Sequence, residues 1–476
     1  MLRMNQNYAP KTQALPHQIE AVNFIDNHKE VALFDEQGLG KTKVVIDSLC
    51  RSFRNKEIEG ALIIAPMTLL YNWELEVAKH SYLIPIVLRG SSKEKRYKFL
   101  TGANFYITNY ESVIAEIERI KRFCKSRRVA IVLDESARIK DPITKTAQAV
   151  FELRPFSEKR IIITGTPVAN KPVDIWAQYY FLDGGQLLGP DYKIFKSRLN
   201  EKNESYIGYL QELQEIVGAN SIRRRKDDVL ELPEKIFKNI YVELQGQQLD
   251  IYNKLKEELR IEITAMDGST IIDESDNILK KLLRLTQIAS NPWLIDRGYK
   301  DTPVKFEELD SIVEGIVDKN EKAIIWTSFV DNILLLKTRF ARFNPLVIYG
   351  DIPIVERASF VEKFQESDKY KIMIANPAAA REGITLTKAN NAIYVDRNFN
   401  LVDYLQSQDR IHRISQTKTC TIIKLIAKNT IDEYIDRFVN YKKGIASFVQ
   451  GDVSSLDSDT SDFLFRKQEL LSILGG

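Results

Sequence analysis

Residues 35–42, DEQGLGKT, contain the residue types of a phosphate-binding loop. Gly38 and Gly40 allow backbone N–H groups to turn toward phosphate oxygens, and Lys41 can reach the β- and γ-phosphates of a nucleotide. Thr42 adds a hydroxyl group that can bind Mg²⁺ at the start of a helix. An aspartate replaces the first glycine of the usual pattern, but an apolar run precedes the loop and a helical pattern follows it. This placement predicts a site for ATP and Mg²⁺.

A pair of carboxylates, Asp134 and Glu135, follows another apolar run, residues 131–133. A carboxylate at the C-terminal end of a parallel strand points toward the crevice in which such sheets bind ligands. There Asp134 can hold Mg²⁺ through water, and Glu135 can orient or deprotonate the attacking water. The alternative is that the pair only caps the next helix. Because the pair lies on another strand of the same predicted sheet as Lys41, we favour the catalytic interpretation.

Arg410 and Arg413 lie in QSQDRIHRISQ, residues 406–416, on a helix predicted over residues 401–414. Residues spaced i, i+3 lie on one face of a helix. Planar guanidinium groups suit the charge that develops on a transferring phosphoryl group, so the pair is a candidate for arginine fingers. A pair of surface salt bridges is the alternative. The nucleotide site predicted in the other sheet favours the fingers.

The segment ITGTP, residues 163–167, places small polar residues at the end of another predicted strand. Its Thr164, Gly165 and Thr166 could sense the γ-phosphate and couple it to movement of the lobes. Taken alone, the segment is equally compatible with a simple turn.

Composition places few limits on function. The chain has 476 residues, 44% hydrophobic and 28% charged, which predicts a globular protein of two or three domains. It lacks a run of about eighteen apolar residues and an apolar N-terminal leader, so we predict neither a membrane span nor secretion. Cys50, Cys124 and Cys420 match no metal spacing and fit a reducing compartment as packing residues. The net charge of +3 identifies no polyanionic partner, and the run IRRRK at residues 222–226 fits a solvated face or a phosphate contact equally well.

Short apolar runs alternate with amphipathic helical patterns in two blocks of the chain. The predicted strands of the first block are 31–34, 61–65, 105–108, 129–133 and 160–163. Those of the second block are 323–327, 346–349, 372–375, 392–395 and 420–426. Uniformly apolar strands separated by helices indicate parallel sheets covered on both faces. The predicted fold class is therefore α/β, with two tandem parallel-sheet lobes and a mainly helical insertion between them.

The two blocks divide the chain into four parts. Residues 1–182 form a first, ATP-binding lobe, and residues 183–300 form mainly helical insertions and the connection between the lobes. Residues 301–450 form the second lobe. Residues 451–476 combine a polar, acidic loop with a C-terminal helix, which we expect to dock onto the second lobe.

Together these motifs resemble helicase superfamily 2, and specifically the Swi/Snf-type DNA translocase ATPases. The likeness covers residues 15–438, in the ordered segments LPHQIEAVNFI, DEQGLGKT, APMTLLYNWELE, TNYE, ITGTP, RRRKDDVLELPEK, LLRLTQIASNPWLI, QSQDRIHRISQ and TIDEYI. The resemblance implies two RecA-like lobes and places Gln18 on the adenine of ATP. It also assigns Gly383 to nucleotide binding, although Ala380 and Arg381 replace the family's paired glycines. The family's DEAH-like box reads DESA here, without the histidine.

The resemblance implies a DNA-dependent ATPase, a motor of the helicase/translocase type that runs on double-stranded DNA. ATP and Mg²⁺ would bind at a cleft between the lobes, with Gln18, Lys41, Thr42, Asp134 and Glu135 from the first and Arg410 and Arg413 from the second. Binding to the nucleic-acid backbone would be independent of sequence and sensitive to salt. We expect a monomeric, cytoplasmic motor of a bacterial or viral setting, or a nuclear one if the source is eukaryotic. Two alternatives remain: a strand-separating DNA or RNA helicase, and a non-catalytic, ATP-gated DNA-binding subunit of a recombination or defence complex.

Overall fold

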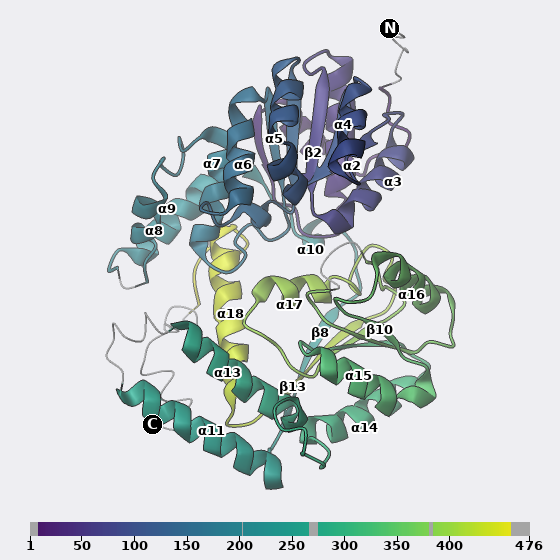
Figure 1. The fold of residues 1–476 in the computed structure, drawn as a ribbon, viewed down its shortest axis with the longest axis vertical. Coiled ribbons are helices and arrows are strands. Elements are labelled where there is room, and N and C mark those ends of the chain that lie inside the picture. The colour runs from purple at the N-terminus through teal and green to yellow at the C-terminus, as the bar shows by residue number, and fades with distance from the viewer. Residues whose placement is uncertain (1–7, 202, 266–274, 380–383, 458–476) are drawn as a thin grey trace. The chain divides into compact units, whose positions relative to one another are not determined.

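The chain divides into two compact units, described here from a computed structural model (Figure 1). The structure describes residues 8–201, 203–265, 275–379 and 384–457, so Gly383 and the predicted C-terminal helix lie outside the described residues. Unit 1 comprises Met1–Glu231 and Ile445–Leu456, and unit 2 comprises Leu232–Gly444 and Asp457–Gly476. None of the helices in the described ranges is long and apolar enough to cross a membrane.

Unit 1 contains a parallel sheet whose strand order is β3-β4-β2-β5-β6-β1-β7. Its strands are β1 (Glu30–Leu33), β2 (Gly60–Ala65), β3 (Ile86–Val87), β4 (Phe105–Asn109), β5 (Val129–Asp134), β6 (Lys159–Ile163) and β7 (Ser221–Ile222). Its helices are α1 (Pro16–Asp26), α2 (Lys41–Arg54), α3 (Leu70–His80), α4 (Ser92–Leu100), α5 (Tyr110–Lys125), α6 (Lys145–Leu153), α7 (Trp176–Asp183), α8 (Tyr192–Arg198), α9 (Tyr206–Ala219) and α10 (Lys226–Val229). Figure 1 shows α2 and α3 on one side of β2, and α5, α6 and α7 on the other.

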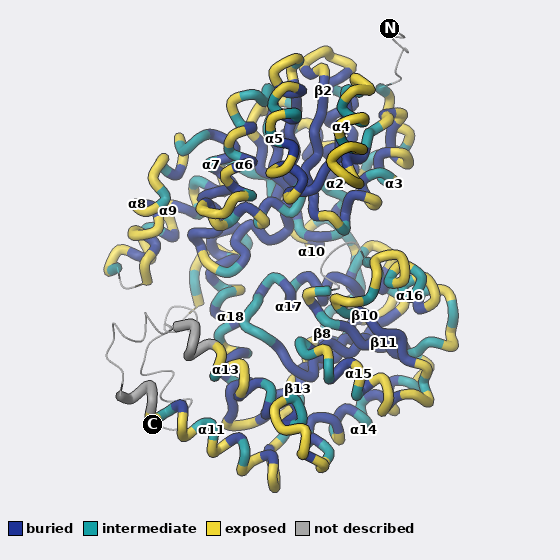
Figure 2. Tube along the Cα trace, in the orientation of Figure 1, coloured by how far each residue is buried: buried dark blue, intermediate teal, exposed yellow. Residues whose placement is uncertain are grey.

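Helices on both faces explain why the central strands of unit 1 are apolar along their whole length. Every residue of β2 and β4 is buried, and Figure 2 shows β2 dark blue throughout. Side chains on one face pack with α1, α2 and α3 in a single core that includes Ile25, Val45, Ile63, Trp73 and Ile107. All three cysteines are buried and free. Burial raises the pKa of Cys50 to about 11 and that of Cys124 to about 12, so both are unreactive packing thiols.

The register of the sheet brings three strand ends to one level. Leu33, the last residue of β1, pairs with Ile163, the last residue of β6. On the other side of β6, Ile163 pairs with Asp134, the last residue of β5. Since neighbouring strands lie about 4.8 Å apart, the ends of β1 and β5 are within about 10 Å of each other. The three segments that follow these strands are the phosphate loop, the Asp134-Glu135 pair and ITGTP, so the backbone alone gathers them at one edge.

Unit 2 contains a second parallel sheet, in the order β10-β11-β9-β12-β13-β8. Its strands are β8 (Lys235–Val242), β9 (Ala323–Trp326), β10 (Leu346–Ile348), β11 (Ile372–Ala375), β12 (Asn391–Tyr394) and β13 (Cys420–Ala427). Its helices are α11 (Gly246–Ala265), α13 (Ser275–Ser290), α14 (Val304–Asp318), α15 (Val330–Arg339), α16 (Ile354–Glu366) and α17 (Leu401–Gln408). Helix α18 (Ile431–Val449) begins in unit 2, and its last residues belong to unit 1.

The α/β prediction with two parallel sheets is confirmed, and so is every strand predicted in the two blocks. Residues 183–300 are mainly helical, as predicted, but they also contribute an edge strand to each sheet. Strand β7 extends the sheet of unit 1 beside β1, and β8 extends that of unit 2 beside β13. Strand β8 was not predicted because edge exposure leaves its residues only partly buried and mixed in polarity.

Candidate nucleotide-binding site

The phosphate loop ends in a backbone conformation that requires glycine. Gly40 caps helix α2 with φ +81°, and Gly38 has φ +92°. A Cβ atom on Gly40 would lie 2.3 Å from Nε2 of Gln18, so a larger residue would displace the end of that side chain as well as strain the backbone. Lys41 and Thr42 follow in the first turn of α2, where backbone N–H groups remain available for an anion.

Gln18 lies directly against the phosphate loop, although the two are separated in the sequence. Its Nε2 donates to the carbonyl oxygen of Leu39 at 3.2 Å, and its Oε1 accepts from the backbone N–H of Leu15 at 3.0 Å. His17 contacts the same Leu39 carbonyl at 3.1 Å. Helix α1 is thereby tied to the loop, and Gln18 is placed beside the nucleotide position that the resemblance implies.

Lys41 is held by the loop's own carbonyl oxygens. Its Nζ donates to Asp35 O at 2.7 Å and to Glu36 O at 3.2 Å. Burial lowers the pKa of Lys41, and the negative charges of Glu135, Asp35 and Asp134 only partly oppose this. A polyanion in the loop would favour the charged ammonium form, because opposite charge nearby raises the pKa of a lysine.

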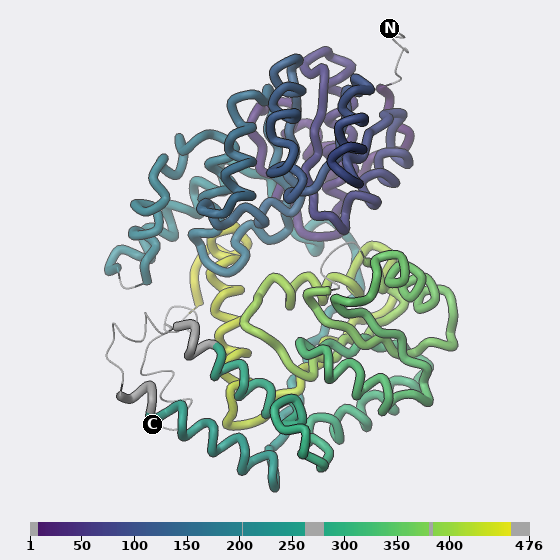
Figure 3. Tube along the Cα trace, viewed as in Figure 1, coloured from purple at the N-terminus to yellow at the C-terminus, as the bar shows by residue number. Residues whose placement is uncertain are grey.

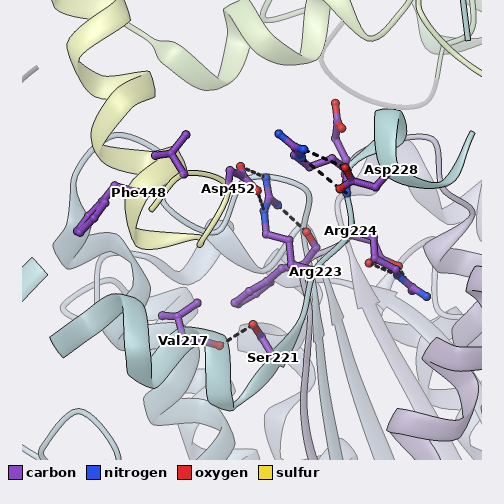
Figure 4. A network of polar contacts seen from close by, with 12 residues as sticks. Val217, Ser221, Arg223, Arg224, Asp228, Phe448 and Asp452 are labelled. Atoms are coloured by element: carbon purple, nitrogen blue, oxygen red, sulfur yellow. Dashed lines mark hydrogen bonds and ion pairs between the residues drawn. The ribbon is translucent and has the colours of Figure 1, made fainter. Parts of the chain in front are cut away.

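The aspartate that replaces the first glycine of the loop has a structural partner. Asp35 is fully buried, and Arg224 forms a bidentate ion pair with it, donating from Nε to Oδ1 at 3.0 Å and from Nη2 to Oδ2. Arg224 also donates to the carbonyl oxygen of His17. Figure 4 shows this arginine next to Arg223 on the segment that follows β7. Arg224, one of the three arginines of IRRRK, is therefore engaged inside unit 1, which neither interpretation of that basic run anticipated.

The two carboxylates lie where the sequence places them, at the end of β5. Oδ1 of Asp134 accepts the backbone N–H of Glu135 at 2.9 Å. Glu135 has left-handed backbone angles, φ +49° and ψ +53°, which cost energy for a residue other than glycine and cluster at functional sites. Gln37 of the phosphate loop contacts Oε1 of Glu135 at 3.5 Å. The carboxylates and the phosphate loop thus form one site.

The ITGTP segment completes this edge of unit 1. The backbone N–H of Thr164 donates to Leu33 O at 3.2 Å, which continues the pairing of β6 with β1. A Cβ atom on Gly165 would lie 2.7 Å from Cγ of Gln37 and 3.5 Å from Nζ of Lys41. The segment therefore packs directly on the phosphate loop and is more than a simple turn.

Two aromatic residues that were assigned no chemical role also position Asp134. The indole Nε1–H of Trp73 donates to Oδ2 of Asp134 at 2.7 Å, and the hydroxyl of Tyr110 donates to its carbonyl oxygen at 2.7 Å. Trp73 lies on the helix after β2, and Tyr110 follows β4 directly. The sheet order explains both contacts, because β5 pairs with β2 and β2 pairs with β4, so residues that follow β2 and β4 fall near the end of β5. The sequence alone does not give this strand order.

Gln178 connects two of the loops where the family's histidine is missing. Ser136 donates from its hydroxyl to Oε1 of Gln178 at 2.7 Å, and Nε2 of Gln178 donates to Pro167 O at 2.8 Å. Ser136 and Gln178 are completely buried. A physical link between the DESA and ITGTP segments is therefore present without the histidine.

The residues of this edge fit ATP with Mg²⁺. The glycines let the loop approach its neighbours closely, since a Cβ atom on Gly40 or Gly165 would lie less than 3 Å from Gln18 or Gln37, and Asp35 is already engaged in a buried ion pair with Arg224. Within the described ranges, no group of three or more His, Cys, Asp or Glu side chains could hold a metal by itself. Mg²⁺ commonly binds through one or two carboxylates together with substrate phosphates, and Asp134 and Thr42 are suited to that arrangement.

Trp73→Phe is expected to weaken activation of ATP hydrolysis by Mg²⁺ about tenfold, because Asp134 loses the donor that orients its carboxylate. The measurement is a Mg²⁺ titration of the hydrolysis rate at saturating ATP. Trp326→Phe is the matched control, since the buried indole N–H of Trp326 has no hydrogen-bond partner among the described residues. Equal shifts in the two variants would show that packing, and not the hydrogen bond, is responsible.

The predicted helix ends before it reaches the two arginines. Helix α17 (Leu401–Gln408) stops short of Arg410 and Arg413, so the prediction that both lie on one helix face is wrong. The Arg410 guanidinium donates from Nε to Gln406 O at 2.9 Å, and its backbone N–H donates to Ser407 O at 3.3 Å. In a continued helix, Gln406 O would accept from the backbone N–H of Arg410. The Arg410 side chain occupies this carbonyl oxygen instead, and the helix ends here.

Arg410 is buried and Arg413 is half-buried, and both donate to residues 384–385. Arg410 donates from Nη1 to Ile384 O at 3.1 Å, and Arg413 donates from Nη1 to Oγ1 of Thr385 at 2.8 Å. Nε of Arg413 donates to Asp409 O at 2.8 Å. Burial lowers the pKa of Arg413, and Asp409 opposes that shift. The structure thus places the arginines together in unit 2, in a turn instead of a helix.

Two family models match the chain. Residues 17–294 match the SNF2-related domain, and residues 304–415 match the helicase conserved C-terminal domain. Among solved structures, the SWI2/SNF2 ATPase core of Sulfolobus solfataricus in complex with dsDNA is 29% identical over 99% of both chains, with a TM-score of 0.45.

Bacterial relatives carry related names. An uncharacterised ATP-dependent helicase of Mycoplasma genitalium is 31% identical over 437 residues, covering 90% of this chain and 41% of the relative. The putative ATP-dependent helicase/translocase YwqA of Bacillus subtilis is 28% identical over 427 residues, covering 86% of this chain and 45% of the relative. The chain spans less than half the length of these curated relatives.

Proposed function

The chain belongs to the SNF2-related family of helicase-type ATPases, and on this premise we propose that it is an ATP-driven motor that translocates on double-stranded DNA. The observation that carries the proposal is the convergence of the phosphate loop, the Asp134-Glu135 pair and the ITGTP segment at one edge of unit 1. The helicase and translocase names of the bacterial relatives support motor activity. The choice of duplex DNA as the track rests on the family likeness.

In this proposal each residue has a defined task. Lys41 neutralises phosphate charge, and Thr42 and Asp134 would hold Mg²⁺, which when bound would supply Lewis-acid stabilisation of the transferring phosphoryl group. Glu135 orients the attacking water and accepts its proton. Gln18 contacts the adenine, and Gly383 takes part in nucleotide binding from the second lobe. Arg410 and Arg413 are proposed to stabilise charge on the γ-phosphoryl group during hydrolysis.

Hydrolysis rates measured side by side without nucleic acid and with single-stranded DNA, duplex DNA and RNA test the proposal. We expect the highest rate with duplex DNA, and we expect that stimulation to fall steeply with salt because backbone contacts release counterions. Lys41→Ala should lower the rate about 10²- to 10³-fold, since phosphate charge is left without its cation. A wild-type rate for Lys41→Ala would exclude this site.

The same assays distinguish the alternatives. Displacement of a triplex strand without duplex unwinding is the result expected for translocation, whereas displacement of a strand from a forked duplex indicates a helicase. Absence of nucleic-acid-stimulated hydrolysis would indicate an ATP-gated binding subunit. We further propose that the chain acts as a monomer in the cytoplasm.

A further inference from the structure

The C-terminal segment of residues 445–456 returns to unit 1, although it follows unit 2 in the sequence. Gln214 of α9 holds it, because Nε2 of Gln214 donates to Phe448 O at 2.7 Å and to Val453 O at 2.9 Å. Figure 3 shows this yellow segment beside the teal segment that contains α9. The attachment is therefore made by specific hydrogen bonds.

A tight turn at the end of α18 fixes the position of Asp452. Gly451 is left-handed, with φ +77°, and its N–H donates to Phe448 O at 2.9 Å. The N–H of Asp452 donates to Ser447 O at 2.8 Å. These two bonds define a Schellman motif, in which glycine ends the helix and the next residue turns back. The backbone thus directs the Asp452 carboxylate, independently of its side-chain partner.

That carboxylate forms a bidentate ion pair with Arg223 (Figure 4). Nε of Arg223 donates to Oδ1 of Asp452 at 2.7 Å, and Nη2 donates to Oδ2 at 2.7 Å. The two side chains are only 13% and 15% exposed, so water screens the pair weakly. Two parallel charge-assisted bonds hold the guanidinium plane in one orientation.

The remaining nitrogen of the Arg223 guanidinium donates to the residue that precedes the phosphate loop. Nη1 of Arg223 donates at 2.7 Å to the carbonyl oxygen of Phe34, the residue immediately before the loop. The backbone beside it is also paired, since Phe34 N donates to Ile222 O and Glu36 N donates to Arg224 O, both at 2.9 Å. The Arg223 side chain therefore connects the C-terminal segment directly to the residue that precedes the loop.

The charge of Arg223 also acts on the loop lysine. Burial lowers the pKa of Lys41, and the positive charge of Arg223 adds to that lowering. Pairing with Asp452 places a negative charge beside the guanidinium and moderates its field at the loop. Geometry and charge thus connect Asp452 to the residue that would bind phosphate.

We propose that Asp452 is a positioning residue for the phosphate loop, and that its ion pair with Arg223 is a latch through which the attached C-terminal segment sets nucleotide affinity. The inference rests on the proposed function, because the nucleotide is the ligand concerned. When the ion pair is formed, Asp452 holds the Arg223 guanidinium in one orientation, in which it donates to Phe34 O. With Asp452 removed, the guanidinium can turn toward solvent and the carbonyl loses its donor.

The test compares Asp452→Asn with Asp228→Asn. Asp228 is the matched control, because its ion pair with Arg225 lies on the same stretch at 2.9 Å but is 45–48% exposed. We expect Asp452→Asn to weaken binding of a fluorescent ADP analogue about tenfold, within the range of coupling through a contiguous network. In the absence of nucleotide, we expect hydrogen exchange at the amides of Phe34 and Glu36 to be faster in Asp452→Asn than in the wild-type chain. The control should change neither quantity.

A double variant separates the latch from a general loss of stability. Arg223→Gln alone should weaken ADP binding as much as Arg223→Gln combined with Asp452→Asn, because the carboxylate acts only through the arginine. Asp452→Glu should restore part of the affinity. Additive losses in the double variant, or exchange rates of Asp452→Asn equal to those of the control, would overturn the proposal. If the wild-type chain binds no nucleotide, the proposed function fails, whereas the exchange comparison still tests the latch.

Discussion

Glu135→Gln is expected to lower kcat for ATP hydrolysis about 10²- to 10⁴-fold, the range contributed by a positioned general base. The substitution preserves the side-chain volume and the contact with Gln37, but the amide cannot accept a proton from water. Glutamine has the same branching as glutamate at the Cβ atom, so the left-handed backbone of residue 135 should be retained. Nucleotide binding should therefore remain close to that of the wild-type chain.

Turnover at saturating ATP and duplex DNA measures the effect of Glu135→Gln, and binding of a fluorescent ATP analogue measures affinity separately. Glu158→Gln is the matched control. Glu158 precedes β6 at the opposite end of the strand from the site and pairs on the surface with Lys29. Wild-type turnover in Glu135→Gln would remove this residue from the mechanism. Equal losses of turnover and affinity would indicate a role in binding instead of proton transfer.

Arg413→Ala is expected to lower DNA-stimulated kcat about 10³-fold or more, as for other arginine fingers. Affinity for ATP should change far less, because the guanidinium would act on charge that develops only in the transition state. Arg413→Lys should restore little, since an ammonium group lacks the planar fork of donors. Arg339→Ala is the control in the same unit, because Arg339 pairs with Asp310 between α14 and α15.

A second variant distinguishes a finger from a structural anchor. Arg413 donates to Oγ1 of Thr385, so its loss could also release the segment around Thr385. Thr385→Val removes that hydrogen bond and leaves the guanidinium in place. If Thr385→Val reduces turnover as much as Arg413→Ala, the arginine acts by holding the segment, and the finger assignment is wrong.

The strands were predictable because each is a short apolar run. A strand in a parallel sheet is buried on both faces, so all of its residues tend to be apolar. Where a strand lies at an edge, as β8 does, only part of each side chain is buried and the pattern weakens. The helix over Arg410 and Arg413 was overpredicted for a different reason. Helical spacing continued in the sequence, but the Arg410 side chain competes for the carbonyl oxygen of Gln406 and ends the helix earlier.

Local sequence was sufficient for the phosphate loop, the carboxylates after β5 and the two-sheet architecture, because each depends on neighbours within a few residues. The contacts that join these parts depend on the path of the whole chain. Trp73 reaches Asp134 across 61 positions, Arg224 reaches Asp35 across 189, and Arg223 reaches Asp452 across 229. No spacing rule connects such partners, since they meet only because the sheet order places β2 beside β5 and β7 beside β1, and because residues 445–456 return to unit 1. In the sequence, Asp35 at the start of the phosphate loop is a departure from the usual pattern. In the folded chain, it is the buried ion-pair partner of Arg224.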